Sequence, residues 1–457
     1  MNIPSLLDAQ RRYFASGATK SIKQRLLILK RLRESVKRHE TAIHDALYTD
    51  FKKPVYESIA SETGLVLREL DHAIKKLEFW VRPKKVKGSM LNFPARDYTY
   101  YEPYGVTLII APWNYPFQLA MTPLIGAIAA GNTAVIKPSE LTQATSQILD
   151  IIISEVFASE YVCVVQGAIP ETTELLAQRW DYIFFTGSVF VGKIVAQAAA
   201  KHLTPTTLEL GGKNPCVIDN TVKVSLVAKR IVWGKFLNAG QTCIAPDYIL
   251  IHSDIKDQFL TALKEELGKA YGENMATSPD LARIINAKNF DRLVAMLEGE
   301  VVVIGGQVDR DQLYISPTIV DNPSLDSLVM QDEIFGPILP VIPYETQRDI
   351  EQIIDRYEKP LSGYVFSRKR SFSNWFLHRF SFGGGAVNDT IIQFINEELA
   401  FGGVGNSGAG SYHGKHSFLA FSHEKSITRK SNLIDLPMRY APYKGKNKVL
   451  KFALKWL

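Results

Sequence analysis

The stretch GVTLIIAP, residues 105–112, is a short apolar run that ends at a proline. Such runs are typical of strands that are buried on both faces of a parallel sheet. Three similar runs follow it, each separated from the one before by a helix-like segment: AVIKP (134–138), VCVVQG (162–167) and YIFFTG (182–187). This alternation predicts an α/β chain with a doubly wound parallel sheet.

The rest of the chain predicts further parts. A second α/β stretch begins near Gly211 and continues to about Phe421, and helical periodicity marks residues 21–48 and 58–80 before the first sheet. Alternating aromatic residues predict an extended ribbon over 97–102. Because 457 residues are too many for one ordinary core, we expect two domains and a smaller third part.

Composition excludes several classes of protein. The net charge is +6, but the 53 basic residues are scattered among 47 acidic ones, which indicates a mixed solvated surface and no nucleic-acid partner. Three cysteines are too few and too far apart for a disulfide framework or a zinc site, so we expect no metal. Without a signal peptide or a long apolar window, the chain is expected to be cytoplasmic.

Two patterns suit a nucleotide. In FFTGSVFVGK (184–193), Gly187 ends a strand, Ser188 opens a helix and Gly192 follows, so that helix N–H groups could meet a pyrophosphate. A tight turn without any ligand has the same pattern. In IKPSE (136–140), Lys137 and Glu140 could hold a ribose, or they could be solvated charges at a helix cap.

Three further residues could carry chemistry. Cys243, in FLNAGQTCIAP (236–246), follows a small polar loop that no core packing requires. Glu209 lies between leucines in LELGGKNP (208–215), where desolvation raises a carboxyl pKa, although a structural ion pair would also fit. Asn114, held between prolines in PWNYP (112–116), is either an oxyanion donor or a turn residue.

Together these residues supply a nucleophile, a base, an oxyanion donor and a nucleotide cradle. From PWNYP through EIFGP (333–337) to FGGVGNSG (401–408), the sequence resembles the aldehyde dehydrogenase superfamily. The most specific match is LELGGKNP followed by the cysteine of GQTC. KPSE (137–140), SGAGSYHGKHSFLAFSHEKS (407–426) and RYAPY (439–443) are most similar to the class 3 branch, whose members act on fatty and aromatic aldehydes.

The resemblance implies NAD(P)-dependent oxidation of aldehydes to carboxylic acids. Cys243 would attack the carbonyl to form a thiohemiacetal, Asn114 would stabilise the oxyanion, and Glu209 would activate water to hydrolyse the resulting thioester. The cofactor-binding residues that the resemblance implies are Lys137 and Glu140 at the adenine ribose, Gly187 and Ser188 at the phosphates with Gly192 beside them, and Glu333 and Phe335 at the nicotinamide ribose.

Some of these roles stay open. Because Glu140 repels a 2′-phosphate, NAD is favoured, although members of this branch also accept NADP. Many members have a threonine where this chain has Val189, so no role for that hydroxyl is carried over. Glu333 is a second candidate for the base.

The family fold implies a homodimer with three parts in each chain. The boundaries that we expect are 1–96 and 103–210 for the nucleotide-binding domain, 211–421 for the catalytic domain, and 97–102 with 422–443 for the oligomerisation arm.

The tail KGKNKVLKFALKWL (444–457) has a basic amphipathic pattern. On a helix, one side carries Lys448, Lys451 and Lys455, and another carries Val449, Leu450, Ala453, Leu454 and Leu457. The pattern predicts reversible contact with a membrane surface, or docking on the chain's own body or on a partner subunit. Membrane contact would suit a long fatty or polyene aldehyde, for which Tyr115, Trp233 and Phe236 would form an apolar funnel, unless they belong to the core.

Two other functions compete with hydrolytic oxidation. In a CoA-acylating relative, CoA takes the acyl group, and thiolysis does not need the base that Glu209 would provide. A non-catalytic binding protein on the same fold would be expected to lack the thiol or the base, and this chain has both.

Overall fold

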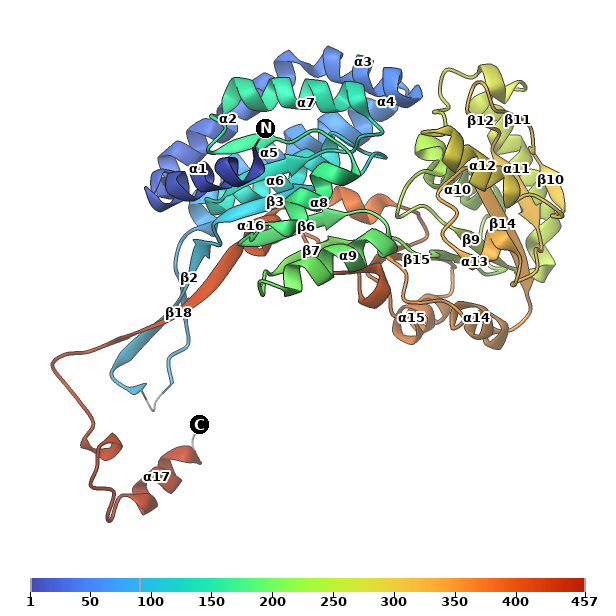
Figure 1. The fold of residues 1–457 in the computed structure, drawn as a ribbon. Coiled ribbons are helices and arrows are strands. Elements are labelled where there is room, and N and C mark those ends of the chain that lie inside the picture. Colours follow the sequence, from blue (N-terminus) through green and yellow to red (C-terminus); the bar gives the residue numbers. More distant parts are fainter. Residues whose placement is uncertain (1, 90–91, 456–457) are drawn as a thin grey trace.

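Two separate sheets dominate the computed structural model, which describes residues 2–89 and 92–455 (Figure 1). The first has the order β17-β7-β6-β3-β4-β5 and is parallel except for β17. Its strands are β3 (Val106–Ile110), β4 (Thr133–Lys137), β5 (Val162–Val164), β6 (Tyr182–Thr186), β7 (Thr206–Glu209) and β17 (Gly408–Ala409). The four predicted apolar runs are therefore confirmed as strands. The strand order reverses at β3, which makes the carboxyl ends of β3 and β6 the expected position for a ligand.

Helices cover both faces of this sheet, because successive side chains of its strands point to opposite sides. Ile109 and Phe184 pack into one apolar cluster with α2, α5, α6 and α7, whereas Leu108 and Ile183 pack into another with α1, α8 and α9. The helical segments of this part are α1 (Ile3–Ala15), η1 (Ala18–Lys20), α2 (Ile22–Arg38), α3 (Glu40–Phe51), α4 (Val55–Ser58), the π-helix η2 (Ile59–Thr63), α5 (Gly64–Trp80), α6 (Gln118–Ala130), α7 (Gln143–Val156), α8 (Ile169–Ala177), α9 (Val189–Ala200) and α16 (Lys415–Ala420).

The second sheet has the order β10-β13-β14-β9-β8-β15-β16 and is parallel except for β10. Its strands are β8 (Pro215–Ile218), β9 (Tyr248–His252), β10 (Val302–Ile304), β13 (Thr318–Asp321), β14 (Ile338–Tyr344), β15 (Ser362–Phe366) and β16 (Gly384–Val387). The remaining elements around it are α10 (Val224–Phe236), η4 (Leu237–Gly240), η5 (Ser253–Ile255), α11 (Lys256–Tyr271), η6 (Met275–Thr277), α12 (Ala287–Ala295), β11 (Val308–Asp309), β12 (Tyr314–Ile315), α13 (Leu328–Gln331), α14 (Gln347–Ile354), α15 (Arg370–Arg379), η7 (Ile392–Ile395) and η8 (Gly405–Ser407).

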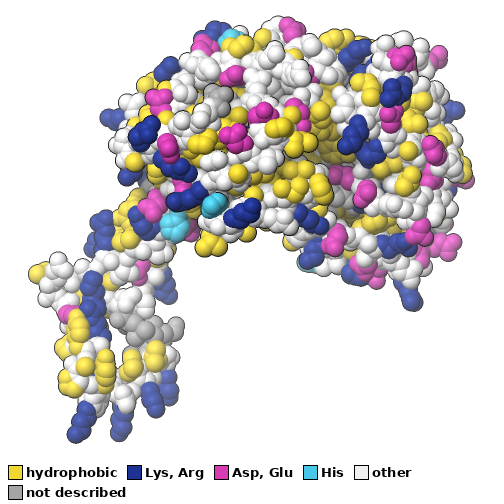
Figure 2. Space-filling view, in the orientation of Figure 1, with side chains coloured by type: hydrophobic (Ala, Val, Ile, Leu, Met, Phe, Trp, Pro, Cys, Tyr) yellow, Lys and Arg dark blue, Asp and Glu magenta, His cyan; other side chains and the backbone are white. Residues whose placement is uncertain are grey.

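A three-stranded antiparallel arm projects from the first part (Figure 1). It contains β1 (Lys84–Val86), β2 (Ala95–Pro103) and β18 (Ser422–Lys430). The ribbon predicted over 97–102 is confirmed as β2, which is longer than predicted. Strand β18 pairs with β2 along its whole length and so extends it at both ends. Beyond β18 lie η9 (Pro437–Arg439) and α17 (Asn447–Leu454), and Figure 2 shows basic side chains beside hydrophobic ones at this far end.

The C-terminal tail is helical over α17, as its pattern predicts, and residues 456 and 457 lie outside the described residues. The exposed side chains of α17 include Val449, Leu450 and Leu454. Within residues 2–89 and 92–455, no helix is both long enough and apolar enough to span a bilayer.

One segment returns from the second sheet to the first. Strand β17 pairs with β7, and the rings of Tyr412 and Phe421 lie 5.0 and 5.8 Å from that of Phe184 in β6. Residues 408–421 therefore pack on the first sheet, although the sequence grouped them with 211–407.

Candidate active site

A strained turn separates the end of helix α10 from Cys243. Asn238, Ala239 and Gly240 have φ angles of 56°, 53° and 73°, in the left-handed region that side chains disfavour. A Cβ on Gly240 would lie 2.3 Å from the carbonyl oxygen of Gly336, so this position accepts only glycine. The turn stops the helix and leaves Cys243 half-buried at the wall of a pocket.

The pocket has a mostly apolar lining. Among the residues that line it are Leu119, Leu237, Ile244, Phe394, Ile395 and Phe401. Tyr115 and Trp233 also line it, as the predicted apolar funnel requires. Phe236 is fully buried in the core of the second sheet, so for this residue the alternative of a core position holds.

Glu209, the last residue of β7, lines the same pocket as Cys243. The side chain is buried, and neither carboxylate oxygen has a hydrogen-bond partner among the described residues. Burial raises the pKa of Glu209 well above its ordinary value. The alternative of a structural ion pair is therefore not what the structure shows. An unpartnered carboxyl with a raised pKa beside a thiol is suited to proton transfer.

Several groups at the pocket influence the pKa of the Cys243 thiol. Burial raises the pKa of the Cys243 thiol, Glu333 and Glu209 raise it further, and the N–H groups of Cys243 and Ile244 oppose these effects. Burial also raises the pKa of Glu333 to about 8. A Cβ on Gly211 would lie 2.0 Å from Glu333 Oε2, so this glycine makes the space that the carboxyl occupies.

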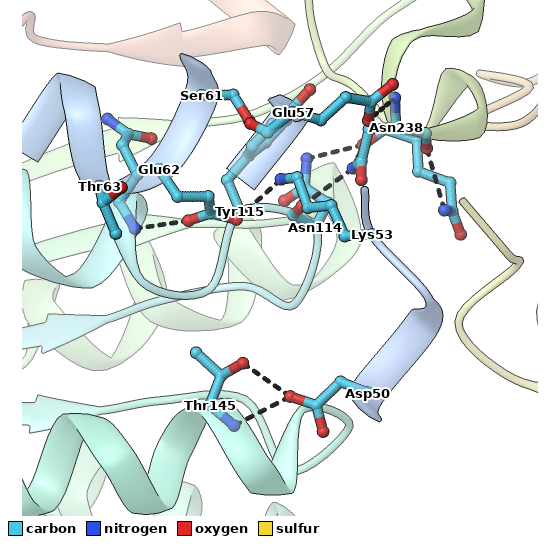
Figure 3. Close-up of polar contacts among 12 residues, drawn as sticks. Asp50, Lys53, Glu57, Ser61, Glu62, Thr63, Asn114, Tyr115, Thr145 and Asn238 are labelled. Atoms are coloured by element: carbon cyan, nitrogen blue, oxygen red, sulfur yellow. Dashed lines mark hydrogen bonds and ion pairs between the residues drawn. The ribbon is translucent and has the colours of Figure 1, made fainter. Parts of the chain in front are cut away.

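Asn114 lies against the loop that carries Cys243 (Figure 3). Its side-chain Nδ2 donates to the carbonyl oxygen of Gln241 at 3.0 Å, and its main-chain carbonyl oxygen accepts from Asn238 Nδ2 at 2.9 Å. Asn114 thus ties two loops together. An asparagine amide has two hydrogens, and the bond to Gln241 uses one of them. The other could be donated to an oxyanion.

Other polar residues at the site were not identified from the sequence. Gln241 anchors the loop through bonds from its Nε2 to the carbonyl oxygens of Asn238 and Arg283. Tyr412 and Thr186 line the pocket, and the buried hydroxyl oxygen of Thr186 has no partner among the described residues. Tyr412 lies in the SYHGK motif, and Thr186 precedes Gly187. The sequence marked these surroundings as part of a site, but it did not mark the two hydroxyl groups themselves.

Helix α9 begins directly after β6, and its free N–H groups could meet an anion there. Ser188 caps α9 and accepts from the N–H of Val191 at 3.4 Å, while the positive end of the helix dipole faces the carboxyl edge of the sheet. A Cβ on Gly187 would lie 2.6 Å from the Phe185 ring. A Cβ on Gly192 would lie 2.6 Å from a methyl of Leu210, so Gly192 allows the helix to approach the chain after β7.

A second pocket lies at the end of β4 and includes Ser139 and Glu140 in its lining. Lys137 is buried beside it, where its Nζ donates to the carbonyl oxygen of Pro138 at 2.7 Å and lies 3.7 Å from Glu140 Oε2. This polar pocket and the start of α9 lie at the carboxyl edge of one sheet. The arrangement fits a dinucleotide, with a ribose near Glu140 and phosphates at α9.

Comparison with known proteins identifies the chain. The sequence model of the aldehyde dehydrogenase family matches residues 2–427. This chain belongs to the aldehyde dehydrogenase family. The enzyme is 47% identical over 441 residues to 4,4'-diaponeurosporen-aldehyde dehydrogenase of Staphylococcus aureus (strain NCTC 8325 / PS 47), with 96% of each chain covered. It is 45% identical over 421 residues to aldehyde dehydrogenase family 3 member A2 of Pongo abelii, with 92% of this chain and 87% of that one covered.

A solved structure agrees with this identification. The substrate-bound state of Staphylococcus aureus AldH matches this aldehyde dehydrogenase with a TM-score of 0.98 at 46% identity, over 99% of this chain and 100% of the other. The predicted α/β fold and the class 3 branch are therefore confirmed. The protein is an oxidoreductase that acts on aldehydes, and its family uses NAD or NADP.

Proposed function

We propose that this aldehyde dehydrogenase oxidises medium-chain and long-chain apolar aldehydes, including fatty and polyene aldehydes, to carboxylic acids. One observation carries the proposal: Cys243 and the unpartnered carboxyl of Glu209 line the same apolar pocket. A thiol captures the carbonyl carbon covalently, and a carboxylate activates the water that releases the acid. The apolar lining favours substrates that bring little polar surface into the pocket.

In the first step, Cys243 gives its proton to a carboxylate and its sulfur bonds to the carbonyl carbon. Glu209 and Glu333 are the candidate acceptors, because both influence the pKa of the thiol. The charge on the former carbonyl oxygen would be stabilised by the Cys243 N–H and by the second amide hydrogen of Asn114. Loss of one such donor typically costs about 10²- to 10³-fold in rate.

The cofactor would lie along the carboxyl edge of the first sheet. Bound NAD or NADP supplies the acceptor for the hydride that leaves the thiohemiacetal carbon. Lys137 and Glu140 would bind the adenine ribose, Gly187 and Ser188 the phosphates, and Glu333 and Phe335 the nicotinamide ribose. The carboxylate of Glu140 would repel a 2′-phosphate, so we infer a preference for NAD.

Hydrolysis of the thioester completes the cycle. Glu209, once ionised, would take a proton from a water molecule, and the oxygen of that water would displace the Cys243 sulfur from the acyl carbon. Burial raises the pKa of Glu209. A general base works best when its pKa lies near the pH of the reaction, so this shift favours Glu209 as a base near neutral pH.

The first prediction concerns the substrate and the acyl acceptor. Purified enzyme with NAD should reduce the cofactor faster with decanal than with acetaldehyde or benzaldehyde, and it should do so without CoA. The comparison is made on kcat/KM from the formation of reduced nicotinamide. A requirement for CoA would contradict hydrolysis and favour acyl transfer, and no turnover with NAD or NADP would indicate a binding protein.

We infer a cytoplasmic, homodimeric enzyme whose C-terminal tail (444–457) touches membrane surfaces reversibly. The thiols of Cys163, Cys216 and Cys243 are all unpaired, which suits a reducing compartment. In the arm, β2 is half-buried and projects from the body, so a second copy would cover it. Exposed leucines and lysines on α17 support contact with anionic lipid.

The second prediction separates the arm from the tail. The full chain should be a dimer by light scattering and should sediment with anionic vesicles. Deletion of 444–457 should abolish sedimentation and leave the dimer intact, because the arm strands end at Lys430. A monomer would contradict the role of the arm, and vesicle binding that survives the deletion would contradict the role of the tail.

A further inference from the structure

A buried cluster of charged side chains, Lys53, Glu57 and Glu62, lies near Asn114 and Tyr115 (Figure 3). Lys53 and Glu62 are fully buried, with Nζ and Oε1 2.8 Å apart, and Glu57 is buried beside them. Their neighbours Tyr56 and Ser61 line the pocket. The charged groups therefore lie one layer behind the surface that a substrate would touch.

The pair of Lys53 and Glu62 holds the loop that follows β3. Glu62 Oε2 accepts from the N–H of Gln118 at 2.8 Å, and Lys53 Nζ lies 4.0 Å from the centre of the Tyr115 ring. Tyr115 in turn shares a 2.6 Å hydrogen bond between its hydroxyl and that of Thr242, the residue before the nucleophile. This cluster thus reaches the nucleophile loop through an aromatic side chain.

Glu57 reaches the same loop directly. Its Oε2 accepts from the backbone N–H of Asn238 at 2.9 Å, where the strained turn begins. Without this acceptor, a buried N–H would have no partner, and Asn238 and Ala239 would lose a contact that opposes their relaxation out of the left-handed region. The turn begins five residues before Cys243, so its backbone conformation influences the position of the Cys243 Sγ atom.

We propose that Glu57 is a positioning residue for the nucleophile: its carboxylate holds the turn at 238–240 and so fixes the backbone around Cys243. The ion pair of Lys53 and Glu62 keeps the helical segment that carries Glu57 in place. This inference rests on the proposed role of Cys243, but its test needs neither aldehyde nor cofactor.

The test measures alkylation of Cys243 by iodoacetamide in the full chain at fixed pH, read by mass spectrometry of the peptide. Glu57→Ala should slow alkylation about tenfold, the effect of a thiol pKa raised by about one unit. The reason is that the N–H groups of Cys243 and Ile244, which lower that pKa, lose their alignment. Cys163 and Cys216 are buried and serve as internal references.

Glu69 provides a matched control. It is equally buried, its Oε1 accepts from the N–H of Gly414 at 2.9 Å, and burial raises its pKa to about 7, as it does for Glu57. Glu69→Ala should lower the melting temperature as much as Glu57→Ala while leaving alkylation of Cys243 unchanged. Equal slowing in the two variants would overturn the proposal, because the effect would then be general loosening.

Two further variants keep the test decisive if Glu57→Ala folds poorly. Glu57→Gln keeps an acceptor oxygen and should retain most of the alkylation rate. In the Glu57→Ala background, Ala239→Gly should restore the rate to within about threefold, because glycine adopts positive φ without strain. No restoration by Ala239→Gly, or a rate in Glu57→Ala equal to that of the unmodified enzyme, would overturn the proposal.

Discussion

Replacement of Cys243 by alanine is expected to lower the rate of aldehyde oxidation by at least about 10⁴-fold, because the covalent step loses its nucleophile. No other described thiol can substitute: Cys163 lies in the core of the first sheet and Cys216 in that of the second. The measurement is the steady-state formation of reduced nicotinamide with NAD and decanal.

The control is Cys163→Ala, which removes a buried thiol from β5 in the first sheet. It should retain turnover with a small loss of thermal stability. The melting temperature of Cys243→Ala should equal that of the parent enzyme, since the side chain is half-buried at a pocket wall. Substantial aldehyde oxidation by Cys243→Ala would contradict the thioester mechanism, even though the family fold would stand.

The strands were predictable because their signal is local. The four apolar runs of the first sheet are β3 to β6. Helix limits were less accurate: the periodic segment 21–48 is broken at His39 into α2 and α3. The return of 408–421 to the first sheet was missed, because a two-residue strand such as β17 has no periodicity to detect.

At the site, the residue types were predictable and their contacts were not. The small residues of FLNAGQTC marked an unusual loop, but nothing local showed that Asn238 and Ala239 are left-handed. The bond from Asn238 to Glu57 joins residues 181 positions apart, and the bond from Asn114 to Gln241 joins residues 127 positions apart. Such long-range polar contacts depend on how the two sheets are placed, which sequence patterns do not encode. The roles of the site residues came from family resemblance and stay predictions.

Glu209→Gln is expected to separate acylation from hydrolysis. The first turnover should produce about one equivalent of reduced nicotinamide per active site, and the steady state that follows should be slower by about 10²- to 10⁴-fold, the usual contribution of a general base. The amide has nearly the same size as the carboxyl, and neither oxygen of Glu209 has a partner to lose among the described residues. Rapid mixing with NAD and decanal resolves the two phases.

The pH dependence follows from the same side chain. Glu209 accepts a proton only when ionised, and its pKa is raised by burial, so hydrolysis by the parent enzyme should quicken as pH rises through that pKa and slow below it. Glu209→Gln should lack this rise. Glu333→Gln is the matched comparison, because Glu333 is the other carboxyl that influences the Cys243 thiol. A burst in Glu333→Gln with normal turnover in Glu209→Gln would transfer the base role to Glu333.

Chemical rescue tests the assignment of Glu209 independently of the pH profile. Hydroxylamine is a strong enough nucleophile to attack a thioester without the help of a base, so it should restore multiple turnovers to Glu209→Gln by releasing the acyl group from Cys243. It should have little effect on Cys243→Ala, which forms no thioester. If hydroxylamine fails to restore Glu209→Gln although the burst is complete, the slow step is not deacylation but another step after hydride transfer, such as release of the reduced cofactor, and the base role of Glu209 in hydrolysis is contradicted.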